Sequence, residues 1–204
     1  MKHLFEPGHG SGAPTLVLFH GTGGTERDLL PLAKRISPGA AVLSVRGNVS
    51  ENGMPRFFRR LAEGVFDEED LKFRTHELYR FLGQAADEYR IDRSRFVAVG
   101  YSNGANIAGS LLFHFADAFQ AAILHHPMVP LRGMPLPDLT GVPVWIGAGT
   151  NDPISPVSET EELHRLLADA GADVSVHWER HGHQLTAGET GAAAAWFRER
   201  FAGG

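Results

Sequence analysis

The sequence predicts a single α/β domain whose central sheet is mostly parallel and flanked by helices. Apolar runs that suit strands buried on both faces of a sheet alternate with segments of helical periodicity. The 204 residues are 43% hydrophobic and 21% charged, which is enough for one substantial core and leaves little room for a second. No repeat, low-complexity tract or linker divides the chain. We therefore expect residues 1–204 to form one domain of minimal size, without a large cap domain.

Composition excludes several classes of function. The chain has no cysteine, so disulfides, thiolate metal sites and cysteine nucleophiles are impossible. Its net charge of -5 argues against nucleic acid as a partner, because phosphate binding requires a basic surface. No apolar stretch approaches the roughly 18 residues of a membrane span, and the first residues lack the apolar run of a signal peptide. We therefore expect a cytoplasmic protein that binds neither nucleic acid nor a membrane.

The first part of the chain predicts strands and helices in alternation. Thr15 to His20 is a continuous apolar run, typical of a strand in a parallel sheet. Thr25 can cap a helix that ends near Ser37. In order, the expected elements are a short strand at 2–6, a glycine-rich turn at 8–14, a strand at 15–20, a helix at 25–37 and a strand at 40–45.

Residues 46–70 interrupt this alternation and form the only insertion long enough to cover a site. Asn52-Gly53 is a turn signal, and Pro55 can open a short helix that contains residues 57–60. We expect this insertion to cover the site in part.

After the insertion the alternation resumes. Asp67 with Asp70 resembles the capping pair of a long helix that ends near Tyr89. The remaining expected elements are a strand at 96–101, a helix from 103, strands at 121–126 and 142–148, a helix at 158–170, a strand at 173–178 and a last helix that ends near 201.

Ser102 lies in Gly-Tyr-Ser-Asn-Gly, between a strand rich in Val and Phe and a helix. A serine on such a turn stands clear of the strand end, and Gly100 and Gly104 remove side chains that would collide where strand and helix approach. The following helix directs unpaired N–H groups at any negative charge that forms beside the serine. Glycines and serines also make ordinary turns, but here the strand and the helix supply the required context. The pattern predicts a nucleophile.

Three further loops follow the C-terminal ends of predicted strands, where functional groups gather in parallel α/β sheets. They carry the His20-Gly-Thr-Gly-Gly24 segment, Asp152 and His183. The order Ser102, Asp152, His183, one at each of three strand ends, is the order of the catalytic triad in α/β-hydrolases.

The chain thus resembles the α/β-hydrolase superfamily. Over most of its length it is similar to the phospholipase/carboxylesterase family, which is related to the dienelactone hydrolases. Four segments resemble the branch associated with methylhydroquinone resistance, at residues 56–60, 100–108, 127–130 and 152–154. Dienelactone hydrolases proper use a cysteine nucleophile, so the presence of Ser102 means that the resemblance implies no lactone specificity.

Proton transfer sets the expected roles of the triad. A serine hydroxyl needs a base, so we expect His183 to remove its proton and later to protonate the leaving alcohol. Asp152 would hold the imidazole tautomer and stabilise its cation. The backbone N–H of Asn103, which follows the nucleophile, would stabilise the oxyanion. By resemblance to the His-Gly-x-Gly loops of the family, Thr22 would supply the second donor.

Two members of the triad have alternatives. Asp152 precedes a proline and could form only an Asx turn, although no other aspartate lies at a strand end between Ser102 and the last strand. His183 competes with His181, which we expect to be a loop residue because the second histidine of this pair fits the family.

The insertion and the strand ends supply candidate substrate-binding residues. Phe57, Phe58 and Phe66 could form an apolar substrate wall or merely bury the insertion. The arginines at 56, 59 and 60 could hold an anionic substrate group, but the neighbouring acidic residues favour surface ion pairs. We expect His20 to shape the oxyanion loop. Ordinary packing is an equal alternative for His126, which ends a predicted strand. The candidates beside the expected triad or oxyanion loop are His20, Tyr101, His126 and Met128.

We therefore expect a serine carboxylesterase that cleaves small carboxylic esters through an acyl-enzyme. Its partner would be a small-molecule ester, it would need no cofactor or metal, and a homodimer is an open expectation. A thioesterase or lysophospholipase with the same triad is the close alternative. A metal hydrolase that uses His125, His126, His181 and His183 is a remote one, since no acidic ligand cluster accompanies them. A noncatalytic ligand-binding protein on the same fold is the third, against which the apparently complete triad argues.

Overall fold

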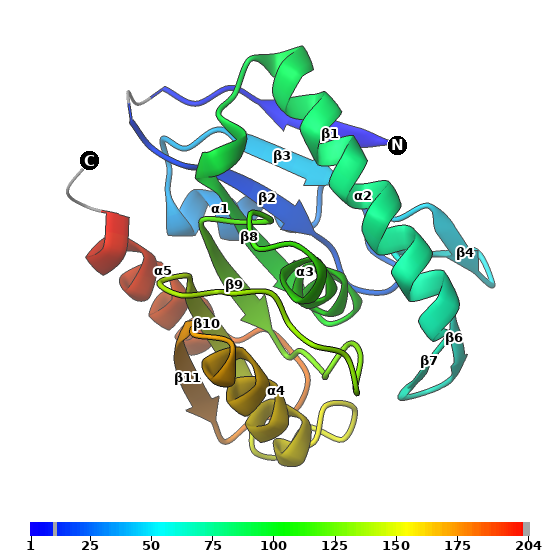
Figure 1. Ribbon diagram of the computed structural model, residues 1–204. Coiled ribbons are helices and arrows are strands. Elements are labelled where there is room, and N and C mark those ends of the chain that lie inside the picture. The colour runs from blue at the N-terminus through cyan, green and yellow to red at the C-terminus, as the bar shows by residue number, and fades with distance from the viewer. Residues whose placement is uncertain (10–11, 202–204) are drawn as a thin grey trace.

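A seven-stranded sheet forms the centre of the molecule, with helices on both faces (Figure 1). The computed structural model describes residues 1–9 and 12–201. The strand order is β1-β3-β2-β8-β9-β10-β11; β1 pairs antiparallel with β3, and the other neighbours are parallel. The strands are β1 (His3–Glu6), β2 (Thr15–Phe19), β3 (Val42–Val45), β8 (Phe96–Tyr101), β9 (Ala121–His125), β10 (Pro143–Gly149) and β11 (Asp173–Glu179). The predicted fold class is confirmed.

The helices divide between the two faces of the sheet (Figure 1). Strand β2 contributes to the cores on both faces: Leu16 and Leu18 pack on the side of α1 and α5, whereas Val17 and Phe19 pack on the side of α2, α3 and α4. This explains why its sequence is continuously apolar rather than alternating. The helices are α1 (Leu30–Ile36), α2 (Glu68–Tyr89), α3 (Asn103–His114), α4 (Val157–Asp169) and α5 (Ala187–Phe201), with a 3-10 helix η1 (Arg93–Arg95) before β8.

The predicted elements of the sheet and its covering helices agree closely with the structure, except at the start of α1. The helix expected from Thr25 begins only at Leu30. The Thr25 hydroxyl donates to Asp28 Oδ1 at 2.7 Å and accepts from the N–H of Arg27 at 3.2 Å, so it closes a turn instead of capping a helix. The glycine-rich turn expected at 8–14 lies partly outside the described residues.

The insertion contains two small hairpins, and the short helix expected from Pro55 is wrong. Strand β4 (Val49–Glu51) pairs with β5 (Met54–Arg56), and β6 (Arg60–Ala62) pairs with β7 (Val65–Phe66). Asn52 and Gly53 join β4 to β5 with φ angles of 51° and 82°, which suit a tight hairpin turn. Pro55 lies in a two-stranded ribbon, where both strands are edges and a missing N–H is tolerated.

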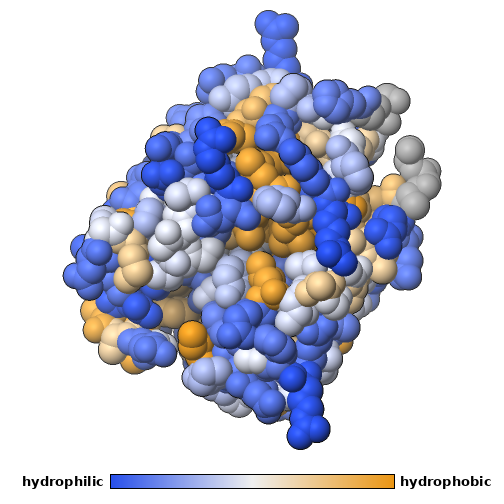
Figure 2. Space-filling view, turned by 180° about the vertical axis from the view of Figure 1, so that it is seen from behind, coloured by the Kyte–Doolittle hydropathy of each residue, from blue (hydrophilic) through white to orange (hydrophobic). Residues whose placement is uncertain are grey.

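The surface is mostly hydrophilic in the view from behind, with apolar residues visible mainly near the middle (Figure 2). Helix α4 buries a single stripe, Thr160, Leu163 and Leu167, at helical spacing, whereas α3 is buried on all sides from Asn103 to Phe113. Among the described residues, no helix combines the length and the apolar character that crossing a membrane requires.

Candidate active site

Ser102 occupies a sharp turn between β8 and α3. Its φ of 53° lies in the left-handed region, a strained conformation that is typical of a nucleophile turn. The flanking glycines permit this turn. A Cβ at Gly104 would lie 1.9 Å from the carbonyl oxygen of Phe19, and one at Gly100 would lie 2.7 Å from Cα of Ala105. The turn holds the serine hydroxyl at the C-terminal edge of the sheet.

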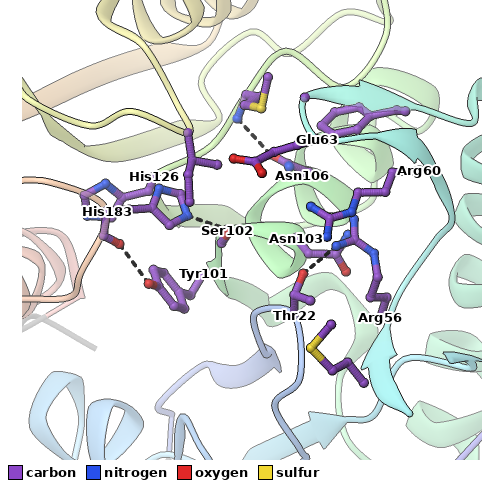
Figure 3. Close-up of a pocket in the computed structure, with 15 residues that line it drawn as sticks. Thr22, Arg56, Arg60, Glu63, Tyr101, Ser102, Asn103, Asn106, His126 and His183 are labelled. Atoms are coloured by element: carbon purple, nitrogen blue, oxygen red, sulfur yellow. Dashed lines mark hydrogen bonds between the residues drawn. The ribbon is translucent and has the colours of Figure 1, made fainter. Parts of the chain in front are cut away.

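Ser102, His183 and Asp152 form a continuous chain of hydrogen bonds. Nε2 of His183 lies 2.8 Å from Oγ of Ser102 (Figure 3), and Nδ1 of His183 lies 2.7 Å from Oδ2 of Asp152. The other oxygen of Asp152 accepts the N–H groups of Ile154 and Ser155 at 2.8 and 2.9 Å. Asp152 therefore forms the Asx turn considered as its alternative and also faces His183.

The electrostatics of Asp152 favour its ionised form. Burial raises the pKa of this carboxyl, but the N–H groups of Ser155 and Ile154 and the bond to His183 outweigh burial and hold the pKa below its usual range. His181 is exposed, and its carbonyl oxygen accepts the N–H of Asn151. The structure thus brings His183, and not His181, to the serine and the aspartate.

Thr22 and Asn103 both line the cavity that contains Ser102. Asn103 is the first residue of α3, so its backbone N–H has no acceptor within the helix. Its side-chain oxygen accepts the N–H of Phe57 at 2.8 Å, which ties the insertion to the nucleophile turn. The side chain of Thr22 accepts from Nη1 of Arg56 at 2.6 Å (Figure 3). The two expected oxyanion donors therefore lie at the same cavity.

His20 fixes the loop that carries Thr22. Its Nδ1 lies 2.7 Å from the Gly21 carbonyl oxygen, and its Nε2 accepts the N–H of Gly47 at 3.1 Å. Burial lowers the pKa of His20, which favours the neutral tautomer that these two partners require. The expectation that His20 shapes the oxyanion loop agrees with this geometry.

Three predicted substrate-binding residues do not reach the cavity. His20, Phe57 and Phe58 are only 2%, 3% and 0% exposed, and they lie beneath the lining residues. The Phe57 ring packs against the rings of Phe19 and His20, and Phe58 packs against Phe66. The packing of both rings favours the alternative in which Phe57 and Phe58 bury the insertion over the one in which they form a substrate wall. Of the three phenylalanines, Phe66 lines the cavity.

The cavity beside Ser102 has a volume of about 370 Å³ and is open to solvent on one side. Tyr101, His126 and Met128, three of the predicted substrate-binding residues, line it (Figure 3). The Tyr101 hydroxyl donates to the carbonyl oxygen of His183 at 2.8 Å and steadies the loop of the expected base. Sequence analysis missed several residues that line the cavity from the insertion, from α3 and from the loop after β10: Met54, Glu63, Gly64, Asn106 and Ile154.

The arginines of the insertion have different surroundings. Arg56 and Arg60 line the cavity, and both contact Glu51: Arg60 Nη2 at 2.7 Å and Arg56 Nε at 3.3 Å. The Arg59 side chain is 63% exposed and pairs with Asp67 at 3.2 Å. The surface ion pair expected for these arginines therefore describes Arg59. Arg56 and Arg60, both paired with Glu51, bring two positive charges to a cavity that Glu63 also lines.

A second buried group of titratable side chains adjoins the triad, and sequence analysis missed its central member, Glu189. Nδ1 of His126 lies 2.9 Å from Asp152 Oδ2, and Nε2 of His126 lies 2.9 Å from Glu189 Oε2. Nδ1 of His125 bonds the other oxygen of Glu189. A signal for Glu189 was present, because it continues the buried stripe of α5 that contains Ala193 and Trp196.

Donor atoms of His126, Asp152 and His183 lie within 4.8 Å of one another, and these are residue types that bind metals. Their separations are those of hydrogen bonds, with Asp152 Oδ2 between the two Nδ1 atoms. The four histidines of the metal alternative do not converge, since His125 bonds Glu189 and His181 is exposed.

The sheet order, the strained serine turn and the hydrogen-bonded histidine and aspartate at neighbouring strand ends together define the α/β-hydrolase class. The comparison with protein families is more specific. The chain belongs to the dienelactone hydrolase family, whose model matches residues 60–196.

Relatives support this assignment over the whole chain. MhqD of Bacillus subtilis (strain 168), a provisionally named hydrolase, is 57% identical over 199 residues, which are 98% of each chain. A crystal structure of a Bacillus cereus carboxylesterase is 62% identical with a TM-score of 0.97, over 98% of this chain and 95% of that one. The structure of YahD with malic acid is 31% identical with a TM-score of 0.93, over 97% and 98% of the two chains. The expectation of an esterase-type hydrolase is confirmed.

Proposed function

We propose that this esterase-type hydrolase cleaves small carboxylic esters through an acyl-enzyme on Ser102. The observation that carries the proposal is the unbroken chain of hydrogen bonds from Ser102 through His183 to Asp152. Nε2 of His183 takes the hydroxyl proton as Oγ attacks the ester carbonyl carbon, and returns that proton to the leaving alcohol. Water, activated by the same nitrogen, then hydrolyses the acyl-enzyme. Asp152 holds the His183 tautomer and stabilises its cation.

The oxyanion formed in both steps would accept hydrogen bonds from the backbone N–H groups of Asn103 and Thr22. The support is that both residues line the cavity at Ser102 and that Asn103 is the first residue of α3. The bonds from His20 to Gly21 and Gly47 hold the Thr22 loop in place before substrate binds. Such preorganisation matters because donors that need no reorientation stabilise the transition state most.

The cavity favours small esters that carry a carboxylate. Its volume of about 370 Å³ limits the combined size of the acyl and alcohol groups. Burial and the neighbouring Arg60 both lower the pKa of Arg56, because they destabilise its positive charge, and Glu51 compensates only in part. An anion bound between the two guanidinium groups would stabilise that charge further. The related YahD structure contains malic acid, which is a small carboxylic acid. A thioesterase or lysophospholipase would use the same triad, and a panel of esters and thioesters of varied chain length separates these activities.

Labelling with a fluorophosphonate tests the nucleophile. We expect intact-protein mass spectrometry to show one adduct on the wild-type protein and none on Ser102→Ala, whereas the exposed control Ser94→Ala should label normally. Ester hydrolysis by Ser102→Ala should fall by at least about 10³-fold. Equal labelling of Ser102→Ala and wild type would reject the assignment. Loss of activity after treatment with a chelator would instead support the metal hydrolase.

The expected location in the cytoplasm, the homodimer and the absence of nucleic-acid binding stay predictions. Cell fractionation, light scattering on the purified protein and a mobility shift with DNA and RNA test them separately.

A further inference from the structure

A single oxygen of Asp152 serves two imidazole rings. Oδ2 lies 2.7 Å from Nδ1 of His183 and 2.9 Å from Nδ1 of His126. The proposed triad uses only the first of these bonds. His126 is 2% exposed, and its two nitrogens are directed at carboxylates, so it offers the cavity only ring carbon atoms. The question is what a second histidine does at the aspartate.

Counting protons answers part of this question. Both nitrogens of His126 lie 2.9 Å from a carboxylate oxygen, of Asp152 on one side and Glu189 on the other. An ionised carboxylate only accepts hydrogen bonds, so two such bonds require a proton on each nitrogen. Either His126 is an imidazolium, or one of the two carboxyl groups carries the second proton.

Both carboxyl groups are surrounded by donors that favour their ionised forms. Asp152 accepts two backbone N–H groups besides the two imidazoles. Burial raises the pKa of Glu189, but the bonds from His125 and His126 outweigh burial and lower this pKa to about 2. Burial has the opposite effect on His126 and lowers its pKa, but the carboxylates of Glu189 and Asp152 outweigh burial and raise this pKa above its ordinary value. These directions favour ionised carboxylates and a protonated imidazole.

The surrounding backbone is shaped around this arrangement. His126 adopts a φ of 52°, a conformation that costs energy for a residue with a side chain, and its N–H donates to the Gly147 carbonyl oxygen at 2.8 Å. A Cβ at Gly147 would lie 2.3 Å from Oε1 of Glu189, so only glycine leaves room for that carboxylate. Glu189 itself is 1% exposed on the inner stripe of α5.

We infer that His126 is a permanent imidazolium at neutral pH, held by Glu189, and that the two residues form a positioning pair behind the catalytic aspartate. The pair keeps Asp152 ionised and aimed at His183. It also places a fixed positive charge near the base: the ring centroids of His126 and His183 are 5.1 Å apart.

Removal of this charge should change the pH dependence of the reaction. Like charges at such a separation repel, so the cation at His126 opposes any further positive charge that forms beside it. The titratable groups that face or adjoin His126 are Asp152, Glu189, His183, His125 and Tyr101, whose ring centroid lies 6.1 Å away. Of these, Asp152 and Glu189 are anions, and burial raises the pKa of Tyr101, which keeps it neutral.

The first experiment reads the protonation of His126 directly. Nitrogen-15 NMR of the imidazole side chains in Ser102→Ala should show one histidine with both nitrogens protonated at pH 7.5, and this signal should be absent when His126→Asn is added. A neutral His126 at that pH would overturn the inference. This readout needs no catalysis, so it stands or falls separately from the proposed function.

The second experiment, which rests on the proposed triad, measures kcat/KM against pH. Asparagine tolerates the left-handed backbone and has an amide that can donate to Asp152, so His126→Asn removes the charge together with the bond to Glu189. The acidic limb of the profile should move to higher pH by about one unit. Glu189→Gln should move it in the same direction, because the Gln amide can donate to a neutral His126, and combining the two changes should add little further.

A purely structural role would leave the acidic limb in place while lowering the melting temperature. Glu26→Gln, which removes another buried carboxylate, is the matched control and should change stability without moving the limb. An unchanged limb in both His126→Asn and Glu189→Gln would overturn the inference. Should His126→Asn fail to fold, the NMR of the Ser102→Ala protein and the profile of Glu189→Gln still decide it.

Discussion

Arg56 and Arg60 show how burial changes the meaning of a charged residue. Exposed ion pairs contribute little to stability, but neither arginine forms one. The Arg56 side chain is 4% exposed, and Arg60 donates to both oxygens of Glu51. Arg59, between them in sequence, is exposed and faces the other way. Three arginines within five positions therefore supply both a test of the proposed anion preference and its control.

Arg60→Gln should reduce the preference for anionic esters. We expect the ratio of kcat/KM for a carboxylate-bearing ester to that for a matched neutral ester to fall by about tenfold or more, since a hydrogen bond to a charged group contributes about 1.5–3 kcal/mol. The matched control Arg59→Gln should leave the ratio unchanged. Steady-state kinetics on the two esters measures it. Equal ratios in wild type and Arg60→Gln would show that the arginines only hold the insertion together.

At the residue scale, the sequence predicted the triad because each member follows a predicted strand. Loops at the C-terminal ends of parallel strands meet at one edge, so order and position selected Asp152 and the loop with His181 and His183, and the resemblance to the family selected His183. The pairing of His126 with Glu189 could not be predicted in the same way. It depends on which face of α5 turns inward and on the room that Gly147 leaves, and both are properties of the packed structure.

At the element scale, the insertion was predicted as an excursion but not as two hairpins. Pro55 and the charged stretch after it suit the first turn of a helix, and this local preference misled the prediction. The Asn52-Gly53 pair was the better signal, because both residues tolerate the positive φ that a two-residue hairpin requires. The hairpins bring Arg56 and Arg60 to the cavity and turn Phe57 and Phe58 into the core.

Phe57→Ala should destabilise the protein without changing its choice among substrates. Loss of a buried phenylalanine costs roughly 3–5 kcal/mol, which for a domain of this size lowers the melting temperature by about 6–20 °C. Relative rates on an ester series of varied chain length should stay as in wild type. Met128→Ala is the counterpart: it lines the cavity, so it should shift the series while the melting temperature changes less. A change in the relative ester rates of Phe57→Ala would instead support the alternative in which Phe57 forms part of a substrate wall.

At the scale of the whole molecule, the parallel sheet explains why so much was predictable. Strands buried on both faces produce continuous apolar runs, and helices connect most of them, although a loop alone joins β9 to β10. The resulting order places β8, β9, β10 and β11 side by side, so the loops that carry Ser102, His126, Asp152 and His183 follow one another along one edge. The buried group of His126, Asp152 and Glu189 therefore links the ends of β9 and β10 to α5.

These buried charges should give the stability of the whole protein a defined dependence on pH. The pKa of Glu189 falls from an ordinary 4.5 to about 2, so its contribution is fully present above pH 4.5 and is lost as pH falls towards 2. The pKa of His126 is raised from 6.5, so its contribution is fully present below pH 6.5 and is lost as pH rises through the raised value. The pair should therefore stabilise the fold most between these limits.

Denaturant unfolding at a series of pH values tests this dependence. The difference in unfolding free energy between wild type and Glu189→Gln should change by about 3 kcal/mol as the pH falls from 5 towards 2, because one pKa unit corresponds to about 1.4 kcal/mol. For His126→Asn the difference should be constant between pH 4.5 and 6.5, where Glu189 stays ionised, and should decline at alkaline pH. Thr160→Val, a buried change with no titrating group, should shift stability equally at every pH. Differences that are independent of pH in both variants would mean that folding leaves the pKa values of Glu189 and His126 unchanged, which would contradict the ion pair. A neutral hydrogen-bonded pair would instead give a contribution of Glu189 that is lost as pH rises above 4.5.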